Sequence, residues 1–160
     1  QAECRGDMLR RRMMMAKAQE VEDMGWKEVK TVVAQNDGDA LYVDGFEAER
    51  IRVTAMLATV TDNKGLRFNI AEGLYDSAFN LGTATTTEFR PLLFELGVVG
   101  NYAISTAFCY PKVSVGTNAQ NTVAGGMALP NGETLIKRFR INSANDKLKA
   151  GSWLKIEKWG

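Results

Sequence analysis

Residues that could carry out chemistry are sparse in this sequence of 160 residues. It contains no histidine, the residue that most often serves as a general base or as a zinc ligand. Nucleophile pairs that rely on histidine are therefore excluded. The carboxylates of Glu88 and Glu95 lie in one predicted strand, but their odd spacing places them on opposite faces of it. Since no acid–base pair is evident, we expect a protein that is not an enzyme.

Metal and cofactor binding find equally little support. The two cysteines, Cys4 and Cys109, are too few for a metal cluster or a disulfide framework. Three aspartates, Asp37, Asp39 and Asp44, lie close together, but they lack the ligand spacing and the flanking helices of a calcium-binding loop. We therefore interpret them as an acidic turn and expect no cofactor and no metal.

The charge pattern argues against nucleic acids and membranes as partners. The formal net charge is only +1, so no broad positive field would attract a polyanion. A short basic run, Arg10, Arg11 and Arg12, is followed by an acidic segment and has no aromatic residues between its cations, which favours packing against protein. No apolar run approaches the ~20 residues of a membrane-spanning helix, so we expect no membrane insertion.

One predicted loop carries a candidate ligand-binding group. Tyr75 lies beside Asp76 and close to Asn80, and an exposed aromatic ring with polar neighbours can stack on a sugar. The other tryptophans and tyrosines fall mostly in predicted strands, where alternation favours a place in the core. Those residues are Trp26, Tyr42, Tyr102, Tyr110, Trp153 and Trp159.

From residue 26 onward, apolar and polar residues alternate in short runs bounded by Gly, Asn, Asp or Pro, which predicts about eight strands. The predicted strands cover residues 26–32, 40–46, 51–57, 66–70, 86–96, 102–110, 134–141 and 153–159. Turn-forming clusters at 36–39 and 62–65 predict antiparallel hairpins, and two long loops are expected at 72–85 and 113–131. We therefore expect an all-β fold, an antiparallel β-sandwich of jelly-roll type over residues 26–160.

Residues 1–25 differ in kind and predict a partly helical N-terminal arm. They contain good helix formers and no aromatic residue or proline. An isolated helix of this length is marginally stable, so we expect the arm to become ordered against another subunit. Its proposed contacts are the basic and thioether side chains of Arg10, Arg11, Arg12, Met13, Met14 and Met15.

Several segments resemble a family of bacteriophage virion proteins. Residues 148–160, LKAGSWLKIEKWG, are similar to the closing strand of a group of phage β-sandwich proteins, and residues 135–145 are similar to the strand and turn before it. The order of the first strands also fits that group: an opening strand at 26–34, a short strand ending at 46 and a long strand at 50–60. Residues 8–16, MLRRRMMMA, resemble Arg- and Met-rich leaders before sandwich domains in minor structural proteins of gut phages.

The resemblance implies a structural component of the virion, of the head-decoration, head-fibre or tail type. Its partners would be other virion proteins and further copies of itself, with a trimer as one candidate assembly. The alternative is a carbohydrate-binding or host-receptor-binding module whose partner is a host surface glycan. The resemblance carries over no catalytic residue and leaves residues 73–130 unmatched.

Overall fold

The computed structural model describes residues 6–15, 25–38, 40–61, 64–71, 79–84, 89–111, 120–143 and 147–160. A helix covers residues 6–15, and all ten strands follow it. The strands are β1 (Trp26–Val33), β2 (Ala40–Val43), β3 (Arg50–Leu57), β4 (Lys64–Asn69), β5 (Phe79–Ala84), β6 (Arg90–Val99), β7 (Tyr102–Pro111), β8 (Gln120–Ala128), β9 (Phe139–Ser143) and β10 (Trp153–Trp159). A short 3₁₀ turn, η1 (Pro130–Gly132), precedes β9.

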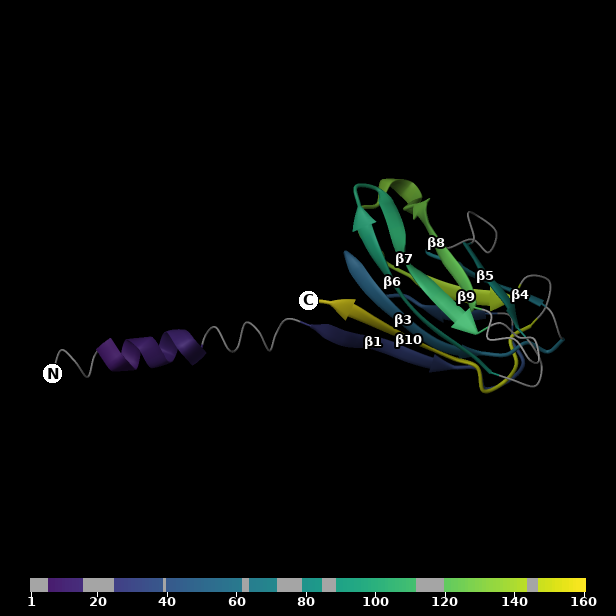
Figure 1. The fold of residues 1–160 in the computed structure, drawn as a ribbon, viewed down its shortest axis with the longest axis horizontal. Helices are drawn as coiled ribbons and strands as arrows, with labels where there is room; N and C mark the ends of the chain where they lie inside the picture. The colour runs from purple at the N-terminus through teal and green to yellow at the C-terminus, as the bar shows by residue number, and fades with distance from the viewer. Residues whose placement is uncertain are drawn as a thin grey trace.

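The strand order is that of a jelly roll. The large sheet has the order β1-β10-β3-β6-β7-β8 and the small sheet has the order β2-β9-β4-β5. Strands pair antiparallel as β1 with β10, β2 with β9, β3 with β6 and β4 with β5. The chain thus forms a long double ribbon that rolls up into two sheets, and the β7–β8 hairpin widens the large one (Figure 1). This arrangement confirms the predicted antiparallel sandwich of jelly-roll type.

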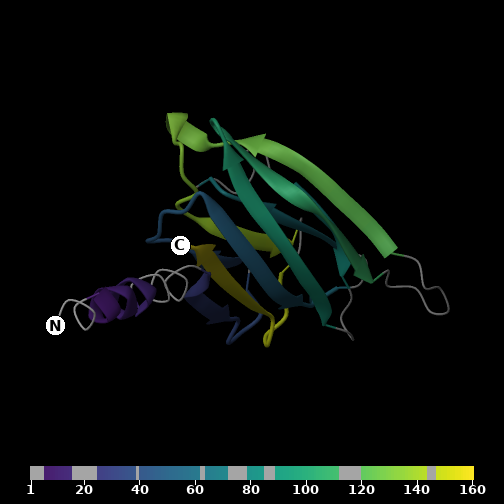
Figure 2. The same ribbon diagram turned by 60° about the vertical axis from the view of Figure 1, so that its left-hand side comes forward.

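The core lies between the two sheets, which form the two layers seen in Figure 2. Three phenylalanines join the layers: Phe68 and Phe139 come from the small sheet and Phe94 from the large one. The ring centroid of Phe68 lies 5.2 Å from that of Phe94 and 5.4 Å from that of Phe139. All three side chains are buried, so contacts between these aromatic rings tie the sheets together.

The turn before β10 is fixed by Gly151 and Ser152. Gly151 has a φ of +91°, a left-handed conformation that favours glycine. The Oγ of the buried Ser152 accepts a hydrogen bond from Ala58 N at 3.1 Å and donates one to Ala58 O at 3.3 Å. The hydroxyl therefore satisfies both backbone groups of a residue that follows β3, and it sets where β10 begins beside that strand.

The predicted hairpins at 36–39 and 62–65 are wrong. The first cluster connects β1 to β2 and the second connects β3 to β4, and each of these pairs is divided between the two sheets. Turn residues show that the chain reverses, but they do not show which strand becomes the partner. A two-residue hairpin does occur at Gly100 and Asn101, where Val99 pairs with Tyr102 and Gly100 has a φ of +63°.

The two predicted long loops each contain a strand. Strand β5 lies inside residues 72–85, and β8 lies inside residues 113–131. Their sequences, FNLGTA and QNTVAGGMA, are rich in small residues, and each has only two large apolar side chains, so the alternation is too short to predict a strand. The predicted strand at 134–141 begins only at Phe139, and the one at 86–96 is displaced to Arg90–Val99.

The Ser152 hydroxyl yields a stability prediction. In a Ser152→Ala variant, the backbone groups of Ala58 lose their partner, so the free energy of unfolding should fall by about 1–3 kcal/mol. Urea unfolding followed by circular dichroism measures this change. As a control, Thr134→Ala at an exposed position should change stability by less than about 0.5 kcal/mol. Equal effects in both variants would contradict the role assigned to Ser152.

Candidate functional site

The exposed apolar side chains of this protein are concentrated on two surfaces. Among the described residues, 13 large apolar side chains are exposed, of which five lie on the helix at 6–15. Six more lie on one face of the large sheet, the side turned away from the small sheet, which we call the outer face. These six are Val33, Leu93, Val99, Tyr102, Ile104 and Trp159. Since the largest apolar patches of soluble proteins are often functional, both surfaces are candidates for binding.

The strand register shows why these residues share a face. Along β10, Leu154 and Ile156 are fully buried in the core, so Trp153, Lys155, Glu157 and Trp159 must point outward. The residues paired across the sheet continue the outer face. Met56 lies opposite Trp153 and Pro91 opposite Met56, while Leu93 lies opposite Thr54.

A strip of charged and aromatic residues crosses the middle of the outer face. Arg52 makes a bidentate ion pair with Glu157, with Nε–Oε1 and Nη2–Oε2 distances of 3.0 and 2.9 Å. Arg50 pairs with Glu95 differently, because its Nε and Nη2 both donate to the same oxygen, Oε2, with Nε at 3.2 Å. Each arginine lies over the ring of Trp26, at 4.8 Å for Arg52 and 5.3 Å for Arg50. The strip is therefore internally paired, and it separates two apolar areas.

The first apolar area is a groove at one end of the outer face. It has a volume of about 270 Å³ and is lined by Thr54, Ala55, Met56, Pro91, Leu92, Leu93 and Trp153. Leu93 is 61% exposed, which is unusual for a leucine at the middle of a sheet. The second area, which we call the hairpin patch, consists of Val99, Tyr102 and Ile104 beside the β6–β7 turn.

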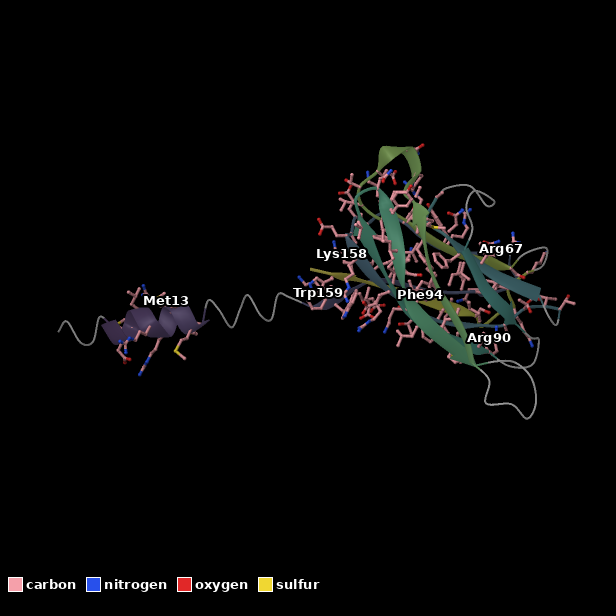
Figure 3. The ribbon with its side chains drawn as sticks, turned by 45° about the horizontal axis from the view of Figure 1, so that its top comes forward. Met13, Arg67, Arg90, Phe94, Lys158 and Trp159 are labelled. Carbon is pink, nitrogen blue, oxygen red and sulfur yellow. The ribbon has the colours of Figure 1, made fainter. Side chains whose placement is uncertain are left out.

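The helix at 6–15 presents the second surface. Its apolar side chains are Met8, Leu9, Met13, Met14 and Met15, and each is more than half exposed. Figure 3 shows Met13 projecting from this helix, whereas Phe94 lies among the side chains of the sandwich. Within the helix, Arg11 pairs with Asp7 one turn earlier, with an Nη2–Oδ2 distance of 3.3 Å. The predicted helical arm is therefore present, and its methionines are available for contact.

The expectation that most aromatic residues are in the core is wrong for the large sheet. Tyr102 and Trp159 are about half exposed, and Trp26 and Trp153 face outward as well. The strand at 153–159 carries large apolar side chains on both of its faces, so alternation alone does not tell which ones are buried. The predicted bounds of this strand are confirmed, but the sequence does not show which face is turned to the core.

The predicted sugar-binding residues are only partly covered by the structure. Tyr75 and Asp76 lie outside the described residues. Asn80 belongs to strand β5, opposite Arg67, and is not in a loop as predicted. The glycan-binding hypothesis therefore stays a prediction. Tyr42, an aromatic residue of the small sheet, already has the guanidinium of Arg140 4.8 Å from its ring centroid.

A polar hollow of about 680 Å³ lies at the edge of the sandwich. It is lined by Tyr42, Asp44, Gly45, Phe46, Glu47, Lys137, Arg138 and Lys158. Two of its cations are already engaged, because Lys137 contacts Glu47 at 3.6 Å and Arg138 makes a bidentate pair with Glu133. Two of the three cations that line this hollow are therefore neutralised by neighbouring carboxylates.

Comparison with known proteins adds no family. No protein-family model matches the chain, and no curated protein matches it either. In the described part of the chain, no helix has the length and apolar character needed to cross a membrane. Among the same residues, no group of three or more cysteine, aspartate or glutamate side chains is arranged to hold a metal ion.

The Arg52–Glu157 pair yields a prediction about acid stability. The hydrogen bonds from Arg52 lower the pKa of Glu157 below its usual 4.5, and the bond to Glu157 raises the pKa of Arg52. Because the folded state holds Glu157 ionised, the pair stabilises the protein above about pH 4.5. That contribution is lost as the pH falls through the lowered pKa.

A Glu157→Gln variant should therefore be less stable than the wild type by about 1 kcal/mol at pH 7, and the difference should shrink toward pH 3. Urea unfolding at several pH values measures both quantities. Glu47→Gln removes a carboxylate from an exposed pair and should change stability by less than about 0.5 kcal/mol at pH 7. A Glu157→Gln difference that grows as the pH falls would contradict the assigned direction.

Proposed function

We propose that this protein is a structural component of a bacteriophage particle, attached to neighbouring subunits through its N-terminal helix. The observation that carries the proposal is the helix at 6–15, which leaves all five of its large apolar side chains exposed. A ten-residue helix is rarely stable in water without packing, so these side chains need a surface to cover them. In this proposal, the helix attaches the sandwich to a neighbouring subunit of the particle.

The fold supports the proposal by analogy. Jelly rolls are frequent in viral capsid domains, although lectin domains share the same architecture. The similarity of residues 148–160 and 8–16 to phage virion proteins favours the first of these classes. The site supports it further, because the outer face offers apolar areas and internally paired charges, which suit contact between proteins.

The proposal predicts that the protein is part of purified phage particles. Particles would be isolated by density-gradient centrifugation from infected cells, and mass spectrometry would detect the chain at a fixed ratio to the major capsid protein. Its absence from intact particles would overturn the virion proposal. A glycan array with the full chain would then test the alternative of a carbohydrate-binding module.

The attachment role predicts which variants fail to join the particle. When supplied in trans, a Leu9→Asp/Met13→Asp variant should be recovered in particles at a level at least about 10-fold lower than wild type, since burial of both side chains is lost. Val60→Asp is the matched control, because Val60 is also an exposed apolar residue but lies on neither surface. Equal incorporation of the two variants would show that the helix is not the attachment element.

A further inference from the structure

The helix at 6–15 and the groove on the large sheet are both exposed apolar surfaces of one chain. We propose that the helix at 6–15 of one copy docks into the groove on the large sheet of a second copy, with Leu9 and Met13 as its anchors. The inference rests on the proposed function, in which the helix is the attachment element, and it names the partner as another copy of this chain.

The groove has the features of a helix-binding site. Its lining is mainly apolar, and it is centred on Leu93 and bordered by Trp153, Met56 and Pro91. Leu93 is the most exposed large apolar residue of the groove, and the neighbouring Val33 of β1, opposite Trp153, is 48% exposed. Lys155 and Thr54 border it on the side of the charged strip. An amphipathic helix commonly binds such a groove through a few spaced apolar anchors.

The helix supplies anchors at the required spacing. Leu9 and Met13 are four residues apart and therefore lie on one side of the helix, one turn from each other. They are 61% and 58% exposed. Methionine is flexible, so Met13 can adapt to the side chains that line the groove. The other sides of the helix carry the three arginines together with Met8, Met14 and Met15, which stay outside this contact.

The length of the chain allows the helix to reach a neighbour. Nine residues, 16–24, separate the end of the helix from Gly25 and can span at most about 30 Å. The groove lies at the opposite end of β1 from the arm, because Val33 pairs with Trp153 whereas Trp26 pairs with Trp159. Within a single copy, the helix leaves both its own anchors and the groove uncovered.

The area of contact favours an exchange between copies. A ten-residue helix is about 15 Å long and about 10 Å wide, so one docking event covers far less than the ~1,600 Å² of a typical stable interface. When each copy donates its helix and receives one, a closed assembly contains as many helix–groove contacts as chains. After the first contact joins two copies, the contact that closes the assembly forms between chains that are already held together, and so at a high effective concentration.

Light scattering on the full chain tests the inference. The wild type should form a discrete oligomer, and both Leu93→Asp and Leu9→Asp/Met13→Asp should weaken its association by about 30-fold or more. Val60→Asp is the control for an exposed apolar residue elsewhere. Ile104→Asp is the control for the same face outside the groove. Both controls should assemble as the wild type does, and thermal unfolding verifies that each variant is folded.

A mixing experiment separates this arrangement from others. The Leu93→Asp copy keeps an intact helix and the Leu9→Asp/Met13→Asp copy keeps an intact groove, so the two together should associate at least about 10-fold more tightly than either alone. Lack of recovery on mixing would overturn the inference. So would an undiminished oligomer of Leu93→Asp, which indicates a bundle of helices, or an effect of Ile104→Asp as large as that of Leu93→Asp, which indicates sheet-to-sheet contact.

A wild type that stays monomeric would also overturn the inference, but not the proposed function. If that monomer is nevertheless found in purified particles, the helix binds another virion protein and not a second copy. If the wild type assembles as inferred but is absent from particles, the exchange stands while the virion function fails.

Discussion

The fold depends on the position of β10 between β1 and β3. This last strand of the sandwich forms a ladder with each of them, so it joins the first strand to the rest of the large sheet. Leu154 and Ile156 bring fully buried side chains to the core from the same strand. The hydroxyl of Ser152 fixes where β10 starts relative to β3. A shift of one residue at this point would exchange the inner and outer faces of the strand.

The same strands therefore determine both the core and the candidate binding surface. Side chains alternate along β10: Leu154 and Ile156 point into the interior, and the residues at the alternate positions point to the outer face. The outward residues include Trp153, Glu157 and Trp159. Paired arginines and glutamates hold the middle of that face in a defined geometry without leaving charges unpaired. The charged strip limits how far an apolar partner can extend across the sheet, which favours one position of contact over many.

Much of the fold could be predicted from local patterns. Strand β10 was predicted with the bounds that the structure shows, and β1, β3 and β7 were predicted within a residue or so, because their residues alternate clearly. Partner choice could not be predicted in this way, since the turns at 36–39 and 62–65 look the same whether they join paired strands or opposite sheets. Strands β5 and β8 each carry only two large apolar side chains, so the sequence pattern predicts loops there.

Of the two candidate surfaces, only the N-terminal helix could be predicted from the sequence. The basic and methionine-rich run at 10–15 stood out by composition, and the structure places it on an exposed helix. The groove could not be found from sequence, because Met56, Leu93 and Trp153 come from three separate strands and each resembles a core residue. Only the register of those strands shows that these three side chains all point to the outer face.

The central position of β10 in the large sheet also affects how the chain folds during translation. Strands β1 and β3 are synthesised early, yet the strand that separates them begins only at Trp153. At 5–20 residues per second, the ribosome needs roughly 5–20 s to make the chain between Leu57 and Trp153. Throughout that interval, two strand edges lack their partner and expose backbone groups that can pair with other nascent chains. The late synthesis of β10 therefore makes the edges of β1 and β3 the places where incomplete chains can pair with one another.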